Sequence, residues 1–359
     1  MLPLDQLRRF FSAHPLLFLF LLAPQVEYLT GSSQLSWLIG NPPLFFLFLV
    51  QNLGSYGFGV VLAREAQIRW GKGWASVILV GSAYGILNEG IGAGTLFNPD
   101  SAAFGVLGSY GRWLGVNWVW AVGLVMLVHP LFSVSLPVLQ HRLALPETRG
   151  RSLVGSRGLC LAVVGLGIDA LATLLFVGTV RHFFAGPILW TGSCLVMVVL
   201  VVAAYLVPRD LLRPKADKPR VRPLSFFILG TVFIWGVNLG ADFLVNLNVP
   251  PIVVAFFFIA IGGLAFIWVL RNVGQNRNQR HLVALTAGLV ASLIPMGFLG
   301  QLGTGIGLLP VVAVDLLGVL FFVRLWKKYN SSSLFVVRFH QNGMRLVKPP
   351  EKIHSLPAP

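Results

Sequence analysis

Long apolar segments alternate with short polar connections along the whole chain. A helix that crosses a bilayer needs about 20 consecutive, mostly apolar residues. Segments of this kind cover residues 13–30, 43–64, 74–95, 117–138, 158–180, 187–207, 224–246, 251–270, 281–300 and 304–325. The pattern predicts an all-α fold, a polytopic transmembrane bundle of about ten spans. Pro24 and Glu27 interrupt the first span, which we interpret as retained rather than cleaved.

The polar connections indicate how the chain is organised. Residues 1–330 form one predicted transmembrane domain, in which a basic, proline-rich loop at 208–223 separates six helices from four. Residues 331–359 form a predicted cytoplasmic tail. Within the tail, residues 334–347 alternate apolar and polar positions around an Asn-Gly pair, which favours a small β-hairpin. A segment that lies on the lipid headgroups is the alternative.

Composition narrows the class of protein. Hydrophobic residues make up 56% of the 359 residues and charged residues 11%. Soluble domains carry about 25% charged residues, because a folded surface needs them to stay in water. A soluble globular protein is therefore excluded. The chain also lacks a P-loop, a dinucleotide fingerprint, a CxxC pair and an HExxH helix, so we predict no cofactor and no metal site.

The positions of the basic residues explain the net charge of +15. With the N-terminus placed in the cytoplasm, 25 of the 27 Lys and Arg residues fall in inside segments, and only Arg112 and Arg181 fall outside. This bias follows the positive-inside rule. It predicts that the N-terminus and the C-terminus are cytoplasmic. We also expect the protein to lie in the plasma membrane of a prokaryote. The predicted partners of the basic residues are anionic lipids at the cytoplasmic face, and not nucleic acid.

Five acidic residues lie within the predicted spans: Glu27, Glu89, Asp169, Asp242 and Asp315. A charged group in hydrocarbon costs on the order of 3 kcal/mol, so such acids usually face the bundle and have a partner. No Lys or Arg is predicted at their depth. We therefore expect each acid to be protonated, hydrogen-bonded, or in contact with water or a cation.

Glu89 is the first candidate site residue. Asn88 precedes it, and Tyr84 lies four residues before Asn88 on the same helix face. His129, near the middle of the fourth span, is its candidate partner, since the helices of a hairpin are neighbours. A Glu–His pair could bind a proton or a cation, or activate water. The alternatives are a Glu that only joins helices, and a neutral imidazole bonded to a carbonyl freed by Pro130.

Polar residues in other spans extend the list of candidates. Asn238 and Asp242 share one face of the seventh span. They would form an outward-facing polar cluster with Glu89 and the acid of the first span if these three spans meet. Asp169 and Asp315 are isolated acids, each either a proton relay or a singly hydrogen-bonded group.

The chain resembles a family of uncharacterised multi-pass membrane proteins of bacteria and archaea. The resemblance lies in residues 83–99, which include Asn-Glu-Gly at 88–90, in Tyr-Gly-Arg-Trp at 110–113, and in the His129 span that follows. This resemblance implies no particular activity. A weaker similarity is to the CAAX-protease and bacteriocin-processing clan, which pairs a Glu motif with His on later helices. It implies catalytic roles for Glu89 and His129, although the clan's second Glu, its downstream Arg and its second His helix are missing.

Three classes of function stay open. A transporter or permease-like protein, which handles protons, cations or a small solute with its buried carboxylates, is favoured because several acids lack a basic partner. The alternative is a protease-like intramembrane hydrolase that uses Glu89 and His129. The second alternative is a non-catalytic membrane scaffold. Whether the protein is an enzyme is open, with the non-enzymatic classes favoured.

Overall fold

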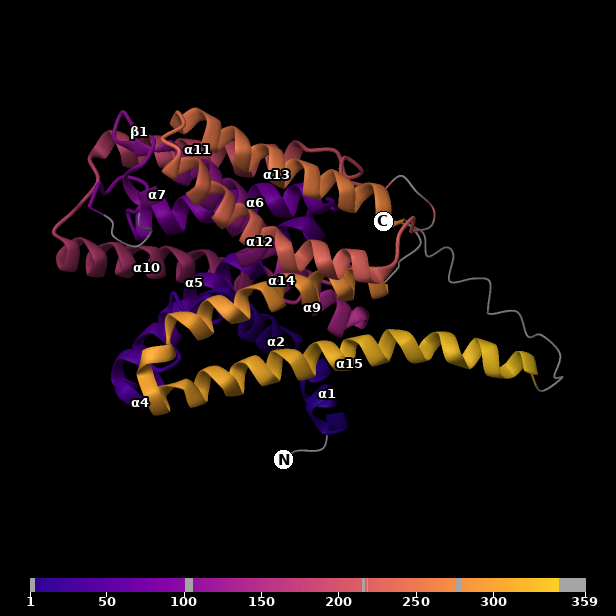
Figure 1. Ribbon diagram of the computed structural model, residues 1–359. Coiled ribbons are helices and arrows are strands. Elements are labelled where there is room, and N and C mark those ends of the chain that lie inside the picture. Colours follow the sequence, from indigo (N-terminus) through magenta and orange to yellow (C-terminus); the bar gives the residue numbers. More distant parts are fainter. Residues whose placement is uncertain (1–3, 101–105, 215–216, 218, 275–278, 342–359) are drawn as a thin grey trace.

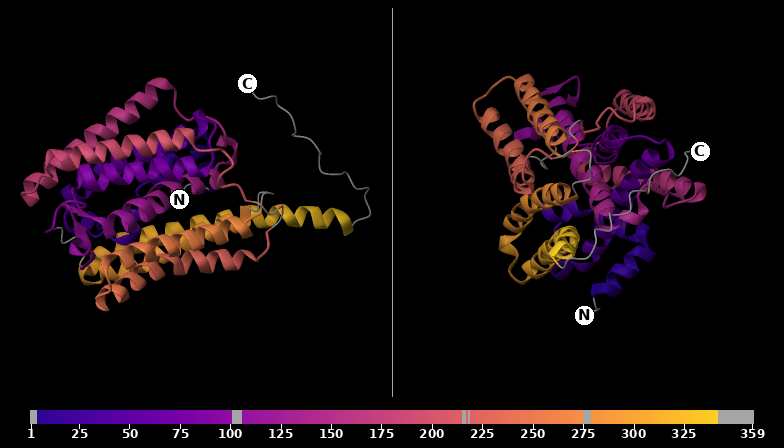
Figure 2. Two further views of the ribbon diagram at one scale, coloured as in Figure 1. Left: turned by 90° about the horizontal axis from the view of Figure 1, so that it is seen from above. Right: turned by 90° about the vertical axis from the view of Figure 1, so that its right-hand side faces the viewer.

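The computed structural model describes residues 4–100, 106–214, 217, 219–274 and 279–341. Within them, the long helices run side by side and form one bundle (Figure 1, Figure 2). These helices are α5 Pro42–Arg69, α6 Trp74–Ile86, α10 Ser156–Arg181, α11 Pro187–Leu206, α12 Pro223–Asn246, α13 Pro251–Asn272, α14 Gln279–Gly300 and α15 Leu308–Gln341.

Shorter elements complete the described part of the chain. They are α1 Leu4–Ala13, α2 Pro15–Leu22, α3 Gln25–Thr30, α4 Trp37–Gly40, α7 Val106–Ser109, α8 Trp118–Trp120, α9 Leu136–Ala144 and the 3-10 helices η4 Pro146–Thr148 and η5 Leu302–Gly307. The segments η1 Leu87–Gly92 and η3 Ala121–Ser135 are π-helical. They extend α6 and join α8 to α9. Strands β1 Arg112–Trp113 and β2 Val116–Asn117 form a small antiparallel hairpin.

The described residues contain nine helical segments long and apolar enough to cross a membrane, and these match the second to tenth predicted spans. The fold is therefore a multi-pass α-helical membrane bundle. The first predicted span, residues 13–30, is not a single helix. It divides into α2 and α3 at Ala23 and Pro24, because proline cannot supply the next backbone donor of α2. The apolar piece Pro15–Thr30 is accordingly shorter than the other spans.

The C-terminal segment differs from the prediction. α15 continues as a helix to Gln341, so residues 334–341 do not form the first strand of the predicted hairpin. Lengthening an existing helix adds one hydrogen bond per residue without a new nucleus, and this outweighs the local alternation of apolar and polar positions. The turn and the second strand of the predicted hairpin lie outside the described residues.

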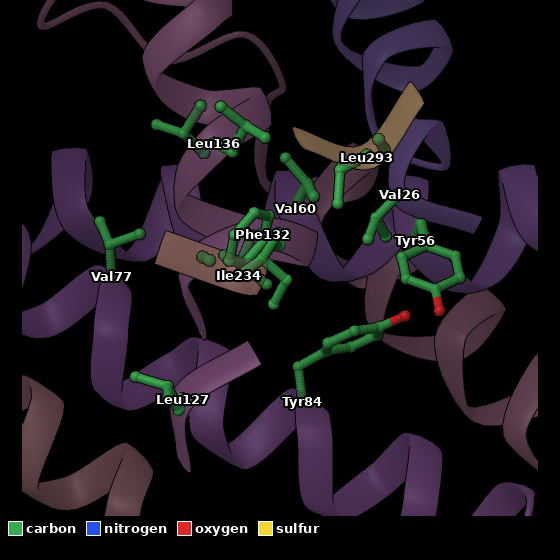
Figure 3. Close-up of a cluster of buried hydrophobic side chains, with 14 of the residues drawn as sticks. Val26, Tyr56, Val60, Val77, Tyr84, Leu127, Phe132, Leu136, Ile234 and Leu293 are labelled. Atoms are coloured by element: carbon green, nitrogen blue, oxygen red, sulfur yellow. The ribbon is translucent and has the colours of Figure 1, made fainter. Parts of the chain in front are cut away.

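The buried core joins helices from both halves of the chain. Figure 3 shows Val60 and Phe132 from the first half packed with Ile234 from the second. α12 and α14 approach each other closely at Gly288, where an added Cβ would lie 2.2 Å from the carbonyl oxygen of Phe227. Small residues at such crossings let helix backbones touch in membranes. The predicted division into six helices and four is therefore not a division of the core.

The connections predicted to be cytoplasmic meet at one end of the bundle, here called the basic end. Hydrogen bonds join all six of them: Ser12 to Glu147, Arg69 to Ser152, Lys72 to Val207, Arg149 to Gln279, Arg220 to Asn272 and Lys328 to Ala144. Arg112 and Arg181 lie toward the opposite end, where Tyr110 donates a hydrogen bond to the Val249 carbonyl. The connections predicted to be cytoplasmic thus lie at one end of the bundle, and the two basic residues predicted to be outside lie toward the other end.

The connection between η1 and α8 packs back over the opposite end. Leu96 and Phe97 are buried. The Arg112 guanidinium donates to the carbonyl oxygens of Phe97 at 3.0 Å and Gly108 at 2.9 Å. Burial lowers the pKa of Arg112 and Asp100 acts in the other direction, but a guanidinium still keeps its charge. These bonds hold the connection in place above Glu89.

Candidate functional site

Glu89 and His129 form a buried hydrogen-bonded pair. Nε2 of His129 lies 3.0 Å from Oε1 of Glu89, and the two residues are 3% and 7% exposed, respectively. The other ring nitrogen, Nδ1, lies 3.1 Å from the hydroxyl oxygen of Ser133. Thr95 donates to the second carboxylate oxygen of Glu89. A continuous chain of hydrogen bonds therefore runs from Thr95 to Ser133, and an imidazole at its centre can accept or release a proton.

Local helix geometry positions this pair. Glu89 lies in η1 and His129 in η3, and both segments are π-helical. Such turns are rare and are frequent at functional sites. A Cβ on Gly81 would lie 2.8 Å from Cα of Pro130. A Cβ on Gly85 would lie 3.0 Å from Cβ of His129. The two glycines, four residues apart, therefore let α6 approach η3 closely enough for the pair to form.

A second group of polar side chains lies beside the pair. The Tyr84 ring packs edge-on against the His129 ring, with centroids 5.7 Å apart. Asn88 donates to the hydroxyl oxygens of Tyr84 at 3.1 Å and Ser55 at 3.2 Å. The carboxyl group of Asp169, on α10, lies beside α5, where its Oδ1 would be 3.2 Å from a Cβ added to Gly54, the neighbour of Ser55. An acid that looked isolated along the sequence therefore reaches the same region as Glu89.

Glu27, on α3, brings a third carboxylate. Tyr56 donates a hydrogen bond to it, and the rings of Tyr56 and Tyr84 pack edge to face with centroids 5.8 Å apart. In Figure 3 the hydroxyl groups of these tyrosines point into one region of the bundle. Electrostatic interactions connect Glu27 with both Glu89 and His129. We define the carboxylate network as Glu27, Ser55, Tyr56, Tyr84, Asn88, Glu89, His129 and Asp169.

The charges of the carboxylate network do not cancel. Among the described residues, the imidazole of His129 is the basic group that pairs with a carboxylate of the network. No Lys or Arg of the described residues pairs with these carboxylates. Three ionised carboxylates with one imidazolium would leave a net negative charge inside the membrane, which is costly. Bound protons or a small cation remove that cost. No group of three His, Cys, Asp or Glu residues in the described ranges lies close enough to hold a metal ion by side chains alone.

Asp242, Asn238 and Asp315 do not join the carboxylate network. α12 turns Val237 and Ala241 to the core, so Asp242, the next residue, is exposed and Asn238 is only partly buried. The condition for the outward-facing polar cluster is that the first, third and seventh spans meet, and α12 packs mainly against α14 and α13 instead. Asp315 is partly buried on α15, which packs against α14.

The sequence prediction did not single out Ser55, Tyr56 and Thr95. A signal for the first two exists, because Gln51 and Asn52 precede them by four residues each and mark a polar stripe along α5. Thr95 lies in an irregular turn after η1, where no periodicity distinguishes it.

A cavity of about 750 Å³ lies at the basic end and uses other parts of the same helices. Trp74 and Ile78 of α6 and Leu131 of η3 belong to its lining. The lining includes neither Glu89 nor His129. The cavity and the carboxylate network are therefore separate sites connected by α6 and η3.

Compared with known proteins, the chain matches no protein-family model, no curated protein and no solved structure. The two resemblances carried by residues 83–99 and 110–113 stay predictions.

Proposed function

We propose that this protein is a membrane transporter whose carboxylate network handles protons or small cations. The observation that carries the proposal is a group of three neighbouring carboxyl groups that, within the described residues, has no Lys or Arg partner; Glu27 and Glu89 are hydrogen-bonded to Tyr56 and His129, respectively. Such a group binds protons or cations to remove its buried charge and can exchange them when the surrounding helices move.

The proposal includes ten crossings, with both termini in the cytoplasm and the protein in the plasma membrane of a prokaryote. The gathering of basic connections at one end favours this orientation. α2 and α3 together would supply the tenth crossing. Ser12, before them, bonds to Glu147 at the basic end, and the Ser36 backbone, after them, donates to Gln301 at the opposite end. Anionic lipids are the expected partners of the basic end.

Vesicles that contain the purified protein and an entrapped pH-sensitive dye test the proposal. Under an imposed membrane potential, we expect faster proton entry than in protein-free vesicles. Glu89→Gln should reduce this flux about tenfold or more, because a neutral amide cannot carry the proton. Asp315→Asn, in a span but outside the carboxylate network, is the matched control and should retain the flux. Uptake of radioactive sodium or rubidium ions tests the cation alternative. Equal ion fluxes with wild-type protein and Glu89→Gln would contradict the proposal.

An intramembrane hydrolase is the second candidate, and the 3.0 Å separation of Glu89 and His129 favours it. In this function the pair would activate a water molecule for attack on a peptide or ester bond. The cavity does not reach either residue, and the clustering of three carboxyl groups without a Lys or Arg partner in the described residues is the observation that favours transport. Cleavage of a fluorogenic transmembrane peptide by wild-type protein, abolished by both Glu89→Gln and His129→Gln, would establish hydrolysis. Absence of cleavage by the wild type would reject it.

A further inference from the structure

The cavity at the basic end combines an apolar interior with a cationic rim. Its lining includes Phe233 of α12, Phe266 of α13 and Leu285 of α14, and the other helical segments that contribute to it are α5, α6, η3 and α9. The basic residues of its lining are Lys72, Arg142, Arg149 and Arg209. No carboxylate is among the described residues that line it. A site with this composition attracts an anion at one end and hydrocarbon along the rest.

Neutral partners hold two of the basic side chains in place. The Arg142 guanidinium lies 4.9 Å from the centre of the Trp74 ring and donates to Gln67. Arg149 donates to the side-chain oxygen of Gln279 at 2.8 Å and to the Arg142 carbonyl at 3.1 Å. These contacts fix the positions of both guanidinium groups without neutralising them. Both therefore keep their positive charge for an anionic ligand, and a fixed guanidinium suits the geometry of a phosphate.

We propose that this cavity binds an anionic membrane lipid, with its phosphate headgroup at the cationic rim and one hydrocarbon chain in the apolar interior. The volume of about 750 Å³ lies within the range of roughly 300–1,000 Å³ that is typical of ligand sites. The cavity is cationic at one end and apolar along the rest, which matches the orientation of a lipid in its leaflet. The rim lies at the end of the bundle where the helices are connected, and the interior extends between the helices toward Leu131 and Phe233. A free phosphate would occupy the rim and leave the apolar interior unfilled.

The inference concerns binding and does not depend on proton or cation transport. Native mass spectrometry of the full-length protein in detergent tests it, with oleoyl lysophosphatidate as the probe. Oleoyl lysophosphatidylcholine has the same chain with a zwitterionic headgroup, and inorganic phosphate has the anion without a chain. We expect lysophosphatidate to bind with one-to-one stoichiometry and about tenfold or more tightly than lysophosphatidylcholine, because its phosphate forms charge-assisted hydrogen bonds that are not screened by choline. We expect inorganic phosphate not to compete.

Variants locate the bound lipid. Arg149→Gln and the exposed Arg209→Gln should each weaken lysophosphatidate binding several-fold, and Arg149→Lys should restore part of it. Arg157→Gln is the matched control, because Arg157 is an exposed basic residue near the same end that does not line the cavity. Ala265→Trp should weaken binding of both lysolipids by filling the interior. Equal binding of the two lysolipids, full competition by inorganic phosphate, or unchanged binding in both Arg209→Gln and Ala265→Trp would overturn the proposal.

Discussion

At the scale of residues, two buried carboxylates are satisfied in different ways. Glu65, at the basic end, accepts hydrogen bonds from Arg64, Arg69 and the backbone of Leu153, so permanent positive charges neutralise it. Within the part of the chain that the structure describes, the carboxylate of Glu89 bonds to the hydroxyl of Thr95 and to the imidazole of His129. Two guanidinium groups thus balance the charge of Glu65, whereas no Lys or Arg among the described residues pairs with Glu89. Glu65 therefore serves stability, and Glu89 is the group to which the proposed function assigns ion exchange.

Glu65→Ala should strongly destabilise the protein. Oε1 of Glu65 lies 2.7 Å from Nη1 of Arg64, and the two side chains are 0% and 1% exposed, respectively. Removing one member of a buried pair costs about 3–5 kcal/mol, because the other charge is left unpaired. Asp210→Ala breaks the exposed pair with Arg213 and should cost about 0–1 kcal/mol. Unfolding of both variants in mixed detergent micelles measures the difference, and equal losses would contradict it.

Tyr56→Phe should also destabilise the fold, by about 1–3 kcal/mol, because it removes the hydroxyl that donates to the buried carboxylate of Glu27. The matched control is Tyr205→Phe, whose ring is 55% exposed and whose hydroxyl lies outside the core. We expect almost no change in its stability. The same unfolding titration compares the two variants, and a loss in Tyr205→Phe as large as that in Tyr56→Phe would argue against the predicted role of this hydroxyl.

At the scale of elements, the apolar segments predict the helices and not their local distortions. About 20 apolar residues in a row must satisfy their backbone groups internally, so the long helices follow from local sequence. The π-helical form of η1 and η3 has no comparable signal in the apolar pattern, although Pro130 within η3 removes one backbone donor. The adjacency of Glu89 and His129 could be anticipated from a helical hairpin. The approach of Asp169 to α5 could not, because it depends on which helices pack together.

Gly81→Ala should separate α6 from η3. Its new methyl group would lie 2.8 Å from Cα of Pro130, and neither backbone can move without disturbing the crossing. We expect a loss of about 1–3 kcal/mol in stability, typical of an overpacked core, together with reduced proton flux. Gly167→Ala is the control, since nothing lies within 4 Å of its added Cβ and alanine favours the helix by about 0.5–1 kcal/mol. Equal stabilities of the two variants would show that the crossing tolerates a side chain.

At the scale of the whole molecule, the distribution of basic residues along the sequence and the packing of the connections distinguish the same two ends of the bundle. The six basic connections are far apart in the sequence, yet hydrogen bonds join them, as between Lys72 and Val207 and between Arg149 and Gln279. The sequence could predict this grouping because the charge bias alternates with every span. The carboxylate network and the cavity at the basic end involve different parts of α6 and η3. A proton bound at one site can influence a ligand at the other only through movement of these shared helices.

The orientation of the two ends can be measured with single cysteines. The exposed natural residues Cys160 and Cys194 are first replaced by serine. Trp113→Cys then places a thiol on the small hairpin at the opposite end, where the tryptophan is 67% exposed. Arg157→Cys places one at the start of α10, near the basic end. With the basic end in the cytoplasm, a membrane-impermeant maleimide should label Trp113→Cys in intact right-side-out vesicles.

Arg157→Cys should react with the same reagent only after the vesicles are opened by detergent. This difference is expected because basic connections are retained on the cytoplasmic side during insertion. The reverse pattern would invert the orientation, and labelling of both positions in intact vesicles would contradict the assignment of the two connections to opposite sides. In either case the anionic lipids of the cytoplasmic leaflet would no longer face the cationic rim of the cavity. The labelling experiment therefore also decides which leaflet could supply the lipid.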